Sequence, residues 1–141
     1  MVGMRRKLRR KRRSECPLNA SVEMIGDRWS LLIVRDMMLG DARSFSALQE
    51  SYEGIATNVL ADRLRKLAAE DIISAAPDPS DRRKRIYRLT AKGIALAPAL
   101  TELALWAAAH EETGRQALIR EMRKNKREFL TRITRRWEKA R

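Results

Sequence analysis

The apolar residues of this chain recur mostly at the spacing of an amphipathic helix. Between positions 57 and 70, for example, Leu60, Leu64 and Leu67 lie at i, i+4 and i+7, which places them on one helical face. The same periodicity predicts helices over about residues 19–26, 28–39, 45–51, 57–70, 91–110 and 115–139. Gly and Pro together contribute only ten residues, which also favours long helices over a loop-rich all-β fold.

Several polar residues precede these segments and are typical helix N-caps. They are Asn19 or Ser21, Asp27, Ser44 and Thr90. Pro98 lies inside the segment 91–110 and predicts a bend there, because proline cannot donate a backbone hydrogen bond. The last segment, 115–139, has its apolar residues near one face and is predicted as one continuous helix.

The hydrophobic period changes to two after residue 70. Residues 72–76 and 85–89 have the alternation of short strands. The connecting segment, PDPSDRRK, is rich in turn-forming residues and in arginine, and Asp78 and Asp81 are placed to restrain these arginines. We therefore predict a β-hairpin with a basic tip in a fold that is mainly α with a small β-hairpin, of the α+β class.

Two short helices joined by a tight turn and followed by such a hairpin form the plan of a winged helix-turn-helix. An α-helix fits the major groove of B-DNA, and a basic hairpin can reach the flanking backbone or the minor groove. The candidate DNA-contacting residues are Thr57, Asn58, Ala61, Asp62 and Arg65 on the helix and Arg82, Arg83, Lys84 and Arg85 at the hairpin tip. Ser44 and Ser46 are candidate phosphate contacts, for which simple helix capping is the favoured role.

The charge distribution points to a polyanionic partner, most simply a nucleic acid, and the winged helix-turn-helix plan makes double-stranded DNA the expected one. The formal net charge is +13, and it gathers at the two ends of the chain. Residues 1–13 carry eight basic and no acidic side chains, whereas residues 115–141 carry eleven basic and three acidic ones. We expect a disordered basic arm over 1–13, a winged helix-turn-helix domain over 14–114 and a basic C-terminal helix over 115–141.

Other function classes have little support in the sequence. A single Cys excludes an intrachain disulfide and multi-Cys zinc sites, and the single His110 has no catalytic partners around it. No apolar run follows the basic start, so no signal peptide is expected. Glu102 in the middle of the most apolar stretch disfavours a membrane span. We expect a non-enzymatic, cytoplasmic, nucleoid-associated protein with no metal or other cofactor.

Several short motifs occur in order along the chain. They are Cys16-Pro17, Gly26 to Ile33, Ser44 to Leu48, Gly54-Ile55 and Leu60 to Leu64, followed by the run YRLTAKGIALAPALTELALW. In this order and spacing, over about residues 16–107, they resemble the HxlR-type winged helix-turn-helix regulators of prokaryotes. The basic ends of the chain fall outside the resemblance.

The resemblance implies a homodimer that binds a near-palindromic operator, usually as a repressor. It also implies that the helix at 57–70 is the recognition helix, that the hairpin is the wing, and that terminal helices form the dimer interface. The candidates for that interface are the segments 91–110 and 115–139, together with residues 17–26. Trp29 and Trp106 are expected to anchor the core or this interface.

The sequence departs from the family at the start of the recognition helix. The family often opens this helix with Ser-Pro-Lys, whereas here it opens with Ala56-Thr57-Asn58. Asn58 can pair with adenine through two hydrogen bonds, and Asp62 can accept from cytosine or orient Arg65. We expect Arg63 to pair with an acidic neighbour instead of DNA.

Cys16 is a candidate redox sensor, because some family members sense oxidants through a cysteine at this position. With one Cys per chain, oxidation yields a sulfenic acid, an adduct or an intersubunit disulfide. The alternative is a small residue that packs at the start of the domain. Two other functions stay open: a general packaging or RNA-associated protein, and a winged adaptor that does not bind DNA. The sequence identifies no effector.

Overall fold

The computed structural model describes residues 11–51 and 53–141, which form eight helices and one two-stranded sheet. The helices are α1 (Pro17–Ile25), α2 (Ser30–Leu39), α3 (Phe45–Gln49), α4 (Thr57–Ala69), α5 (Ala91–Ile94), α6 (Ala97–His110), α7 (Gln116–Lys124) and α8 (Lys126–Lys139). The strands β1 (Ile73–Pro77) and β2 (Arg85–Leu89) pair antiparallel, with Ile73 opposite Leu89. The predicted fold class, mainly helical with a β-hairpin wing, is confirmed.

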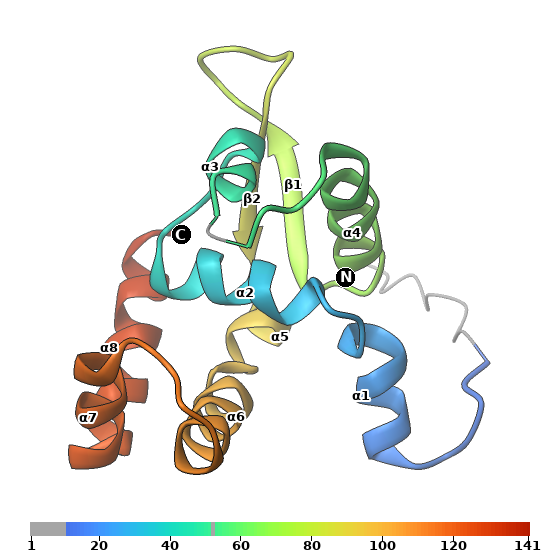
Figure 1. The fold of residues 1–141 in the computed structure, drawn as a ribbon. Coiled ribbons are helices and arrows are strands. Elements are labelled where there is room, and N and C mark those ends of the chain that lie inside the picture. The colour runs from blue at the N-terminus through green and yellow to red at the C-terminus, as the bar shows by residue number, and fades with distance from the viewer. Residues whose placement is uncertain (1–10, 52) are drawn as a thin grey trace, which may run out of the picture.

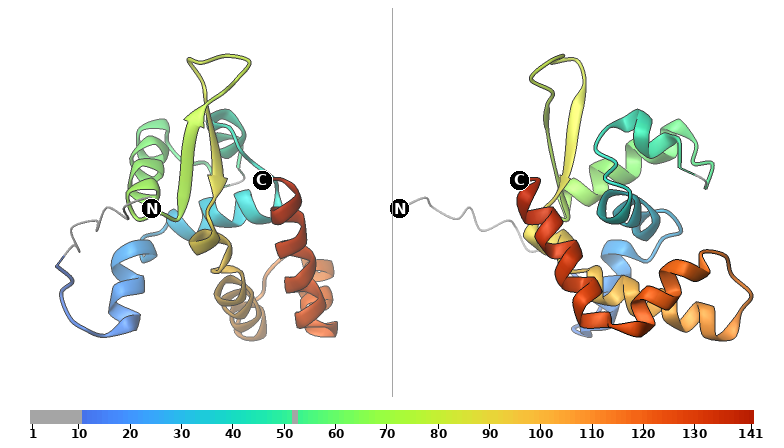
Figure 2. Two further views of the ribbon diagram at one scale, coloured as in Figure 1. Left: turned by 180° about the vertical axis from the view of Figure 1, so that it is seen from behind. Right: turned by 90° about the vertical axis from the view of Figure 1, so that its left-hand side faces the viewer.

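The hairpin projects from one end of the molecule, while helices form the other end (Figure 1). Near the projecting end, α3 and α4 flank the hairpin, and α2 crosses the middle of the molecule. Helices α1, α6, α7 and α8 lie at the opposite end. Two further views show the same separation (Figure 2). The helix-turn-helix and the wing therefore share one side of the fold.

One hydrophobic core joins these elements. Leu60, Leu64 and Leu67 are each at most 2% exposed, which confirms the predicted inner face of α4. Val34 of α2 is fully buried in this core. The buried residues of α7 and α8, including Phe129, belong to the same core, so the basic C-terminal segment packs on the winged domain through its apolar face.

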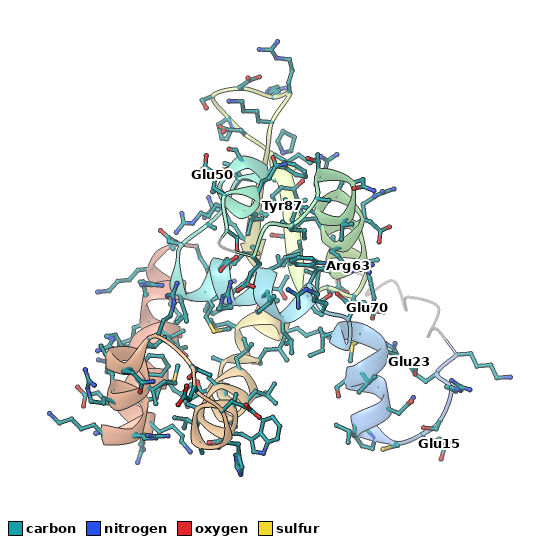
Figure 3. All side chains as sticks on the ribbon, in the orientation of Figure 1. Glu15, Glu23, Glu50, Arg63, Glu70 and Tyr87 are labelled. Atoms are coloured by element: carbon teal, nitrogen blue, oxygen red, sulfur yellow. The ribbon has the colours of Figure 1, made fainter. Side chains whose placement is uncertain are left out.

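The predicted start of the second helix at Arg28 is wrong, because α2 begins at Ser30 with Trp29 in the N-cap position, but the Asp27 carboxylate still binds the backbone ahead of the helix. This carboxylate accepts hydrogen bonds from the backbone N–H groups of Trp29 and Ser30, both at 2.9 Å, and from the Ser30 hydroxyl at 2.5 Å. The Arg63 Nε atom lies 3.0 Å from the same carboxylate. Figure 3 shows Arg63 between α4 and the start of α2. The expectation that Arg63 pairs with an acidic neighbour is thus confirmed.

These contacts govern the ionisation of Asp27. Partial burial opposes its charge, but the hydrogen bonds from Ser30 and Trp29 and the charge of Arg63 outweigh burial and lower its pKa from 3.8 to about 2. Because the pKa is lower in the folded protein, the ionised carboxylate stabilises the fold above about pH 4. That contribution is lost as the pH falls toward 2.

Asp27→Ala is expected to lower the free energy of unfolding by about 2 kcal/mol at pH 7, because it removes the hydrogen bonds from Trp29 and Ser30. In urea unfolding, the difference from wild type should shrink at pH 3, because the unfolded chain takes up a proton at Asp27 there while the folded protein stays mostly ionised. Asp62→Ala is the control, because the Asp62 side chain is 60% exposed and contacts only Arg63 among the described residues. It should change stability by less than about 0.5 kcal/mol. Equal deficits of the Asp27 variant at both pH values would contradict a role for the charge.

The predicted start of the first helix is wrong. Helix α1 begins at Pro17 with Cys16 as its N-cap, because the fixed φ of proline suits the first helical turn. Asn19 and Ser21, the predicted caps, lie inside the helix. The Asn19 amide donates to Glu23 at 2.7 Å, and the Ser21 hydroxyl donates to the Leu18 carbonyl at 2.7 Å.

The two long C-terminal segments are each divided into two helices. The expected bend at Pro98 takes the form of a break between α5 and α6, with Pro98 in the first turn of α6. The single helix predicted over 115–139 is wrong, because Asn125 adopts φ −154° and ψ 88° and ends α7. The Asn125 side chain then caps α8 by accepting from the Glu128 N–H at 3.0 Å. The break lets both helices turn their apolar faces toward the core.

The end of α8 is fastened to the winged domain by three side chains. Arg136 Nη2 donates to the carbonyls of Met38 and Leu39 at the end of α2, at 2.6 and 2.9 Å. Trp137 Nε1 donates to the Leu89 carbonyl at 2.9 Å. Arg88 of β2 donates in return to the Ala140 carbonyl at 2.6 Å. These bonds fix the base of the wing against the C-terminal helix.

One described segment, Ala91–His110, is long and apolar enough to cross a membrane by composition, with a mean hydropathy of 1.2. It is divided into α5 and α6, however, and Ile94, Ala97 and Thr101 are buried against the rest of the protein. One face of the segment therefore packs on the protein, while Leu103 and Trp106 on α6 are exposed.

Candidate nucleic-acid interface

The outer face of α4 presents the predicted base-contacting residues. Thr57, Asn58, Asp62 and Arg65 are exposed, and Ala61 is half-buried. The helix is held from the opposite face by its buried leucines, so this polar face is fixed in place. Asn58 lies in the first turn, at the end of α4 nearest the hairpin tip (Figure 1).

Neighbouring side chains already constrain parts of this face. The Gln49 amide of α3 donates to the Thr57 hydroxyl at 2.5 Å, which links the two helices of the helix-turn-helix. Asp62 accepts from Arg63 at 2.8 Å and not from Arg65, whose Nε instead lies 3.5 Å from the Ala61 carbonyl. Among the described residues, Asn58 has no side-chain hydrogen bond, so its amide is free to read a base edge.

The wing tip is ordered by its two aspartates. Asp78 accepts from the Ser80 hydroxyl at 2.7 Å and from the Ser80 N–H at 2.8 Å, while Asp81 accepts from the Arg83 N–H and Nε, both at 3.1 Å. Asp81 therefore restrains an arginine as expected, whereas Asp78 binds Ser80. The Ser80 bonds lower the pKa of Asp78, and the Arg83 bonds lower that of Asp81.

This turn directs a group of cations outward. Arg82, Arg83, Lys84 and Arg85 are all exposed, and the Arg83 side chain is 91% exposed even while it contacts Asp81. Such an exposed ion pair is worth little in water and exchanges readily for a phosphate. The wing tip can thus neutralise DNA phosphates at small cost.

Ser44 and Ser46 are occupied locally. The Ser44 hydroxyl caps α3 by accepting from the Ala47 N–H at 3.1 Å, and it lies 3.3 Å from the Ser46 hydroxyl. The favoured capping role is therefore observed for Ser44. A further hydrogen bond joins this region to the wing, because the Tyr87 N–H of β2 donates to the Arg43 carbonyl at 2.8 Å. Figure 3 shows Tyr87 part-way along the hairpin, between α3 and α4, where it pairs with Ala75 of β1.

Cys16 lies far from these groups, at the start of α1, and is exposed. The apolar residues of α1 that follow it are exposed as well: Leu18 is 71% exposed and Val22 is 57% exposed. On α6, Leu103 and Trp106 are 50% and 66% exposed. Trp29 packs against the core, whereas Trp106 does not. Apolar side chains of α1 and α6 are thus exposed at the end of the molecule opposite the wing.

The predicted basic arm lies mostly outside the described residues, which begin at Lys11. Within them, Arg12 pairs with Glu70 at 3.1 Å, and the Arg13 N–H donates to Glu23 at 3.3 Å. The residues from 11 to 51 and from 53 to 141 contain no group of three or more His, Cys, Asp or Glu side chains placed to hold a metal.

A second cluster of arginines, at the base of the wing, is not apparent from the sequence. These residues are Arg43, Arg88, Arg136 and Arg141, which line one small cavity. They are separated by up to 98 positions, and no local motif joins them. Only the docking of α8 on β2 brings them together.

A sequence model described as HxlR-like helix-turn-helix matches residues 24–115. The HTH-type transcriptional regulator YodB of Bacillus subtilis is 34% identical over 100 residues, which is 70% of this chain and 88% of YodB. The regulator YvaP of the same organism is 34% identical over 93 residues, or 65% of this chain and 85% of YvaP.

Solved structures agree with this assignment. PA1607, a candidate transcription factor, matches with a TM-score of 0.66 at 37% identity, over 73% of this chain and 70% of PA1607. Reduced YodB from B. subtilis matches with a TM-score of 0.58 at 33% identity, over 72% of this chain and 99% of YodB. The winged fold, the ordered motifs and these relatives lead to one conclusion: the chain belongs to the HxlR-like helix-turn-helix family of transcriptional regulators.

Proposed function

We propose that this protein is a homodimeric, sequence-specific DNA-binding repressor that acts on a near-palindromic operator. The observation that carries the proposal is that the polar face of α4 and the arginines of the wing tip lie at the same end of the fold (Figure 1). In the proposed complex α4 enters the major groove and reads bases through Asn58. Arg82 to Arg85 contact phosphates or the minor groove beside it.

The proposed dimer uses the end of the molecule opposite the wing. The exposed apolar residues of α1 and α6, namely Leu18, Val22, Leu103 and Trp106, support this choice, because a two-fold interface needs such a surface on each copy. The segment 115–141 is also predicted to be part of this dimer interface. Two recognition helices related by a two-fold axis would read half-sites about one helical turn apart, roughly 10 bp.

Selection of bound duplexes from a random DNA pool, at near-physiological salt, tests this function. Enrichment of a two-fold symmetric site is expected. Retention of DNA without any enriched sequence would contradict the proposal and favour a general packaging role driven by the charged ends. Failure to retain DNA at all would favour a winged adaptor. The selected sequence would then guide a search for the promoters of a cytoplasmic, nucleoid-associated regulator.

A redox response through Cys16 is a second candidate, supported by the exposure of its thiol and by YodB. Structures of that relative are described as reduced, diamide-treated and quinone-bound. In a dimer, two Cys16 thiols can lose two electrons and two protons to diamide and form one intersubunit disulfide.

Diamide is expected to lower operator affinity of the wild-type protein and to produce a covalent dimer on a non-reducing gel. Reductant should reverse both effects. Cys16→Ser should bind DNA normally and should not respond. Equal affinities of the reduced and the diamide-treated wild-type protein would contradict redox control.

A further inference from the structure

Four arginines surround a cavity of about 40 Å³ at the base of the wing. Arg43 comes from the loop before α3, Arg88 from β2, and Arg136 and Arg141 from the end of α8. Among the described residues, Asp41 is the single acidic side chain in the lining. A concentration of guanidinium groups around so small a space is typical of a site for a compact anion.

The contacts of these arginines hold them in position but leave most of their charge uncompensated. Arg43 donates to Asp41 at 2.8 Å, which is the one ion pair in the group among the described residues. Arg88 and Arg136 donate to backbone carbonyls, and the Arg141 guanidinium stacks at 4.8 Å over the Trp137 ring. Each guanidinium has five N–H donors, so several remain for a ligand.

We propose that this cluster binds a phosphate group, and that the phosphate belongs to the DNA backbone beside the wing. The inference rests on the proposed DNA-binding function. The guanidinium fork matches phosphate oxygens, and a cavity of this volume accommodates a few waters or a phosphate but not a nucleobase. Arg88 lies three residues, or about 10 Å, along β2 from Arg85 at the wing tip, and the alternation of side chains along a strand places the two on opposite faces of the hairpin.

The surroundings of the cavity favour a polymeric anion. Arg135 and Lys139 of α8 are exposed, line a neighbouring hollow together with Arg136 of the cluster, and have no ion-pair partner among the described residues. On its other side, Arg43 leads directly into α3, the first helix of the helix-turn-helix. Arg136 and Arg141 lie outside residues 24–115, so this phosphate contact is an addition to the shared domain.

The test variant is Arg43→Gln/Arg141→Gln, which leaves Arg88 and Arg136 in place to anchor α8. The control is Arg123→Gln/Lys124→Gln, which removes the same charge from exposed positions on α7 that do not line the cavity. Each full-length protein is assayed by ethylation interference on the selected operator and by the salt dependence of its affinity.

For wild type and control, we expect ethylation to inhibit binding at one phosphate beyond those that the wing tip contacts. The test variant should lose sensitivity at that phosphate, and the slope of log K against log salt should fall by about 1 more than in the control. An interference pattern and a slope equal to those of the control would overturn the proposal.

A second arm distinguishes DNA from free phosphate and does not depend on the operator. Inorganic phosphate is titrated against chloride at matched ionic strength while the thermal midpoint is measured. The assignment to DNA would be overturned if inorganic phosphate raised the thermal midpoint of wild type and control in a saturable way while the test variant lost no backbone contact in the interference assay. The anion site itself would be overturned if inorganic phosphate did not stabilise wild type more than the test variant and if the test variant also kept the backbone contact in the interference assay. Failure of wild type to bind any duplex would contradict the proposed function, whereas the phosphate arm would still report on the cluster.

Discussion

Gly93→Ala is expected to lower the free energy of unfolding by about 3 kcal/mol and the thermal midpoint by roughly 10 °C. A Cβ atom at position 93 would lie 2.1 Å from the Ile72 carbonyl oxygen and 3.1 Å from a Leu89 methyl group. The first of these neighbours is backbone, so the clash cannot be relieved by a rotamer change. The helix α5 would have to move away from the start of β1.

The expected loss is large because several bonds depend on that close approach. The Thr90 N–H donates to the Ile72 carbonyl at 3.1 Å, while the Thr90 hydroxyl donates to the Asp71 carbonyl at 2.5 Å and accepts from the Gly93 N–H at 3.1 Å. Displacement of α5 would weaken this cap together with the packing of Ile94, which is buried.

Gly114→Ala is the matched control, because a Cβ there meets no atom within 4 Å. It should change the midpoint by no more than a few degrees. Thermal denaturation followed by circular dichroism compares the two variants. If the two variants had similar thermal midpoints, the close contact between α5 and the residue before β1 could be relaxed without loss of stability, and the prediction would be wrong.

Substitutions in the wing and in α4 are expected to weaken DNA binding in two different ways. Arg82→Gln/Arg83→Gln should lower affinity for every duplex by about tenfold to a hundredfold and reduce the salt slope by about 2, because both side chains are proposed to neutralise phosphates. Asn58→Ala should lower affinity for the selected operator by about 1–3 kcal/mol, while binding to unrelated duplexes stays unchanged.

Fluorescence anisotropy at several salt concentrations, on the operator and on a scrambled duplex, measures both effects. Lys92→Gln is a suitable control, because Lys92 of α5 donates to the Glu70 carbonyl and lies away from the proposed interface. If the wing and Asn58 variants lost the same affinity on every duplex, the division between phosphate contact and base reading would be wrong.

The elements that the sequence predicts well are those defined by local rules. The leucine spacing of α4, the caps at Ser44 and Thr90 and the arginine-rich hairpin each depend on a few adjacent residues. Those residues also define the candidate DNA-contacting face, so most of that face can be predicted from the amino-acid sequence.

The sequence-based predictions are wrong or incomplete where contacts between distant parts of the chain, and not the local residue pattern, determine the structure. The apolar spacing across Asn125 fits one helix as well as two, and only the position of the core beneath α7 and α8 decides between them. The arginine cluster could not be predicted for the same reason, since its members come from three separate elements. Nothing in the sequence near Arg136 indicates that it caps the end of α2.

The bond between Arg136 and Met38 joins residues 98 positions apart, and this has a consequence for the order of folding. During synthesis the helix-turn-helix and the wing emerge long before α8 exists. The carbonyls at the ends of α2 and β2 and their apolar neighbours therefore stay exposed to water until α8 is made. Such late, long-range closure slows folding and leaves a newly made chain prone to misassembly or aggregation until α8 has docked.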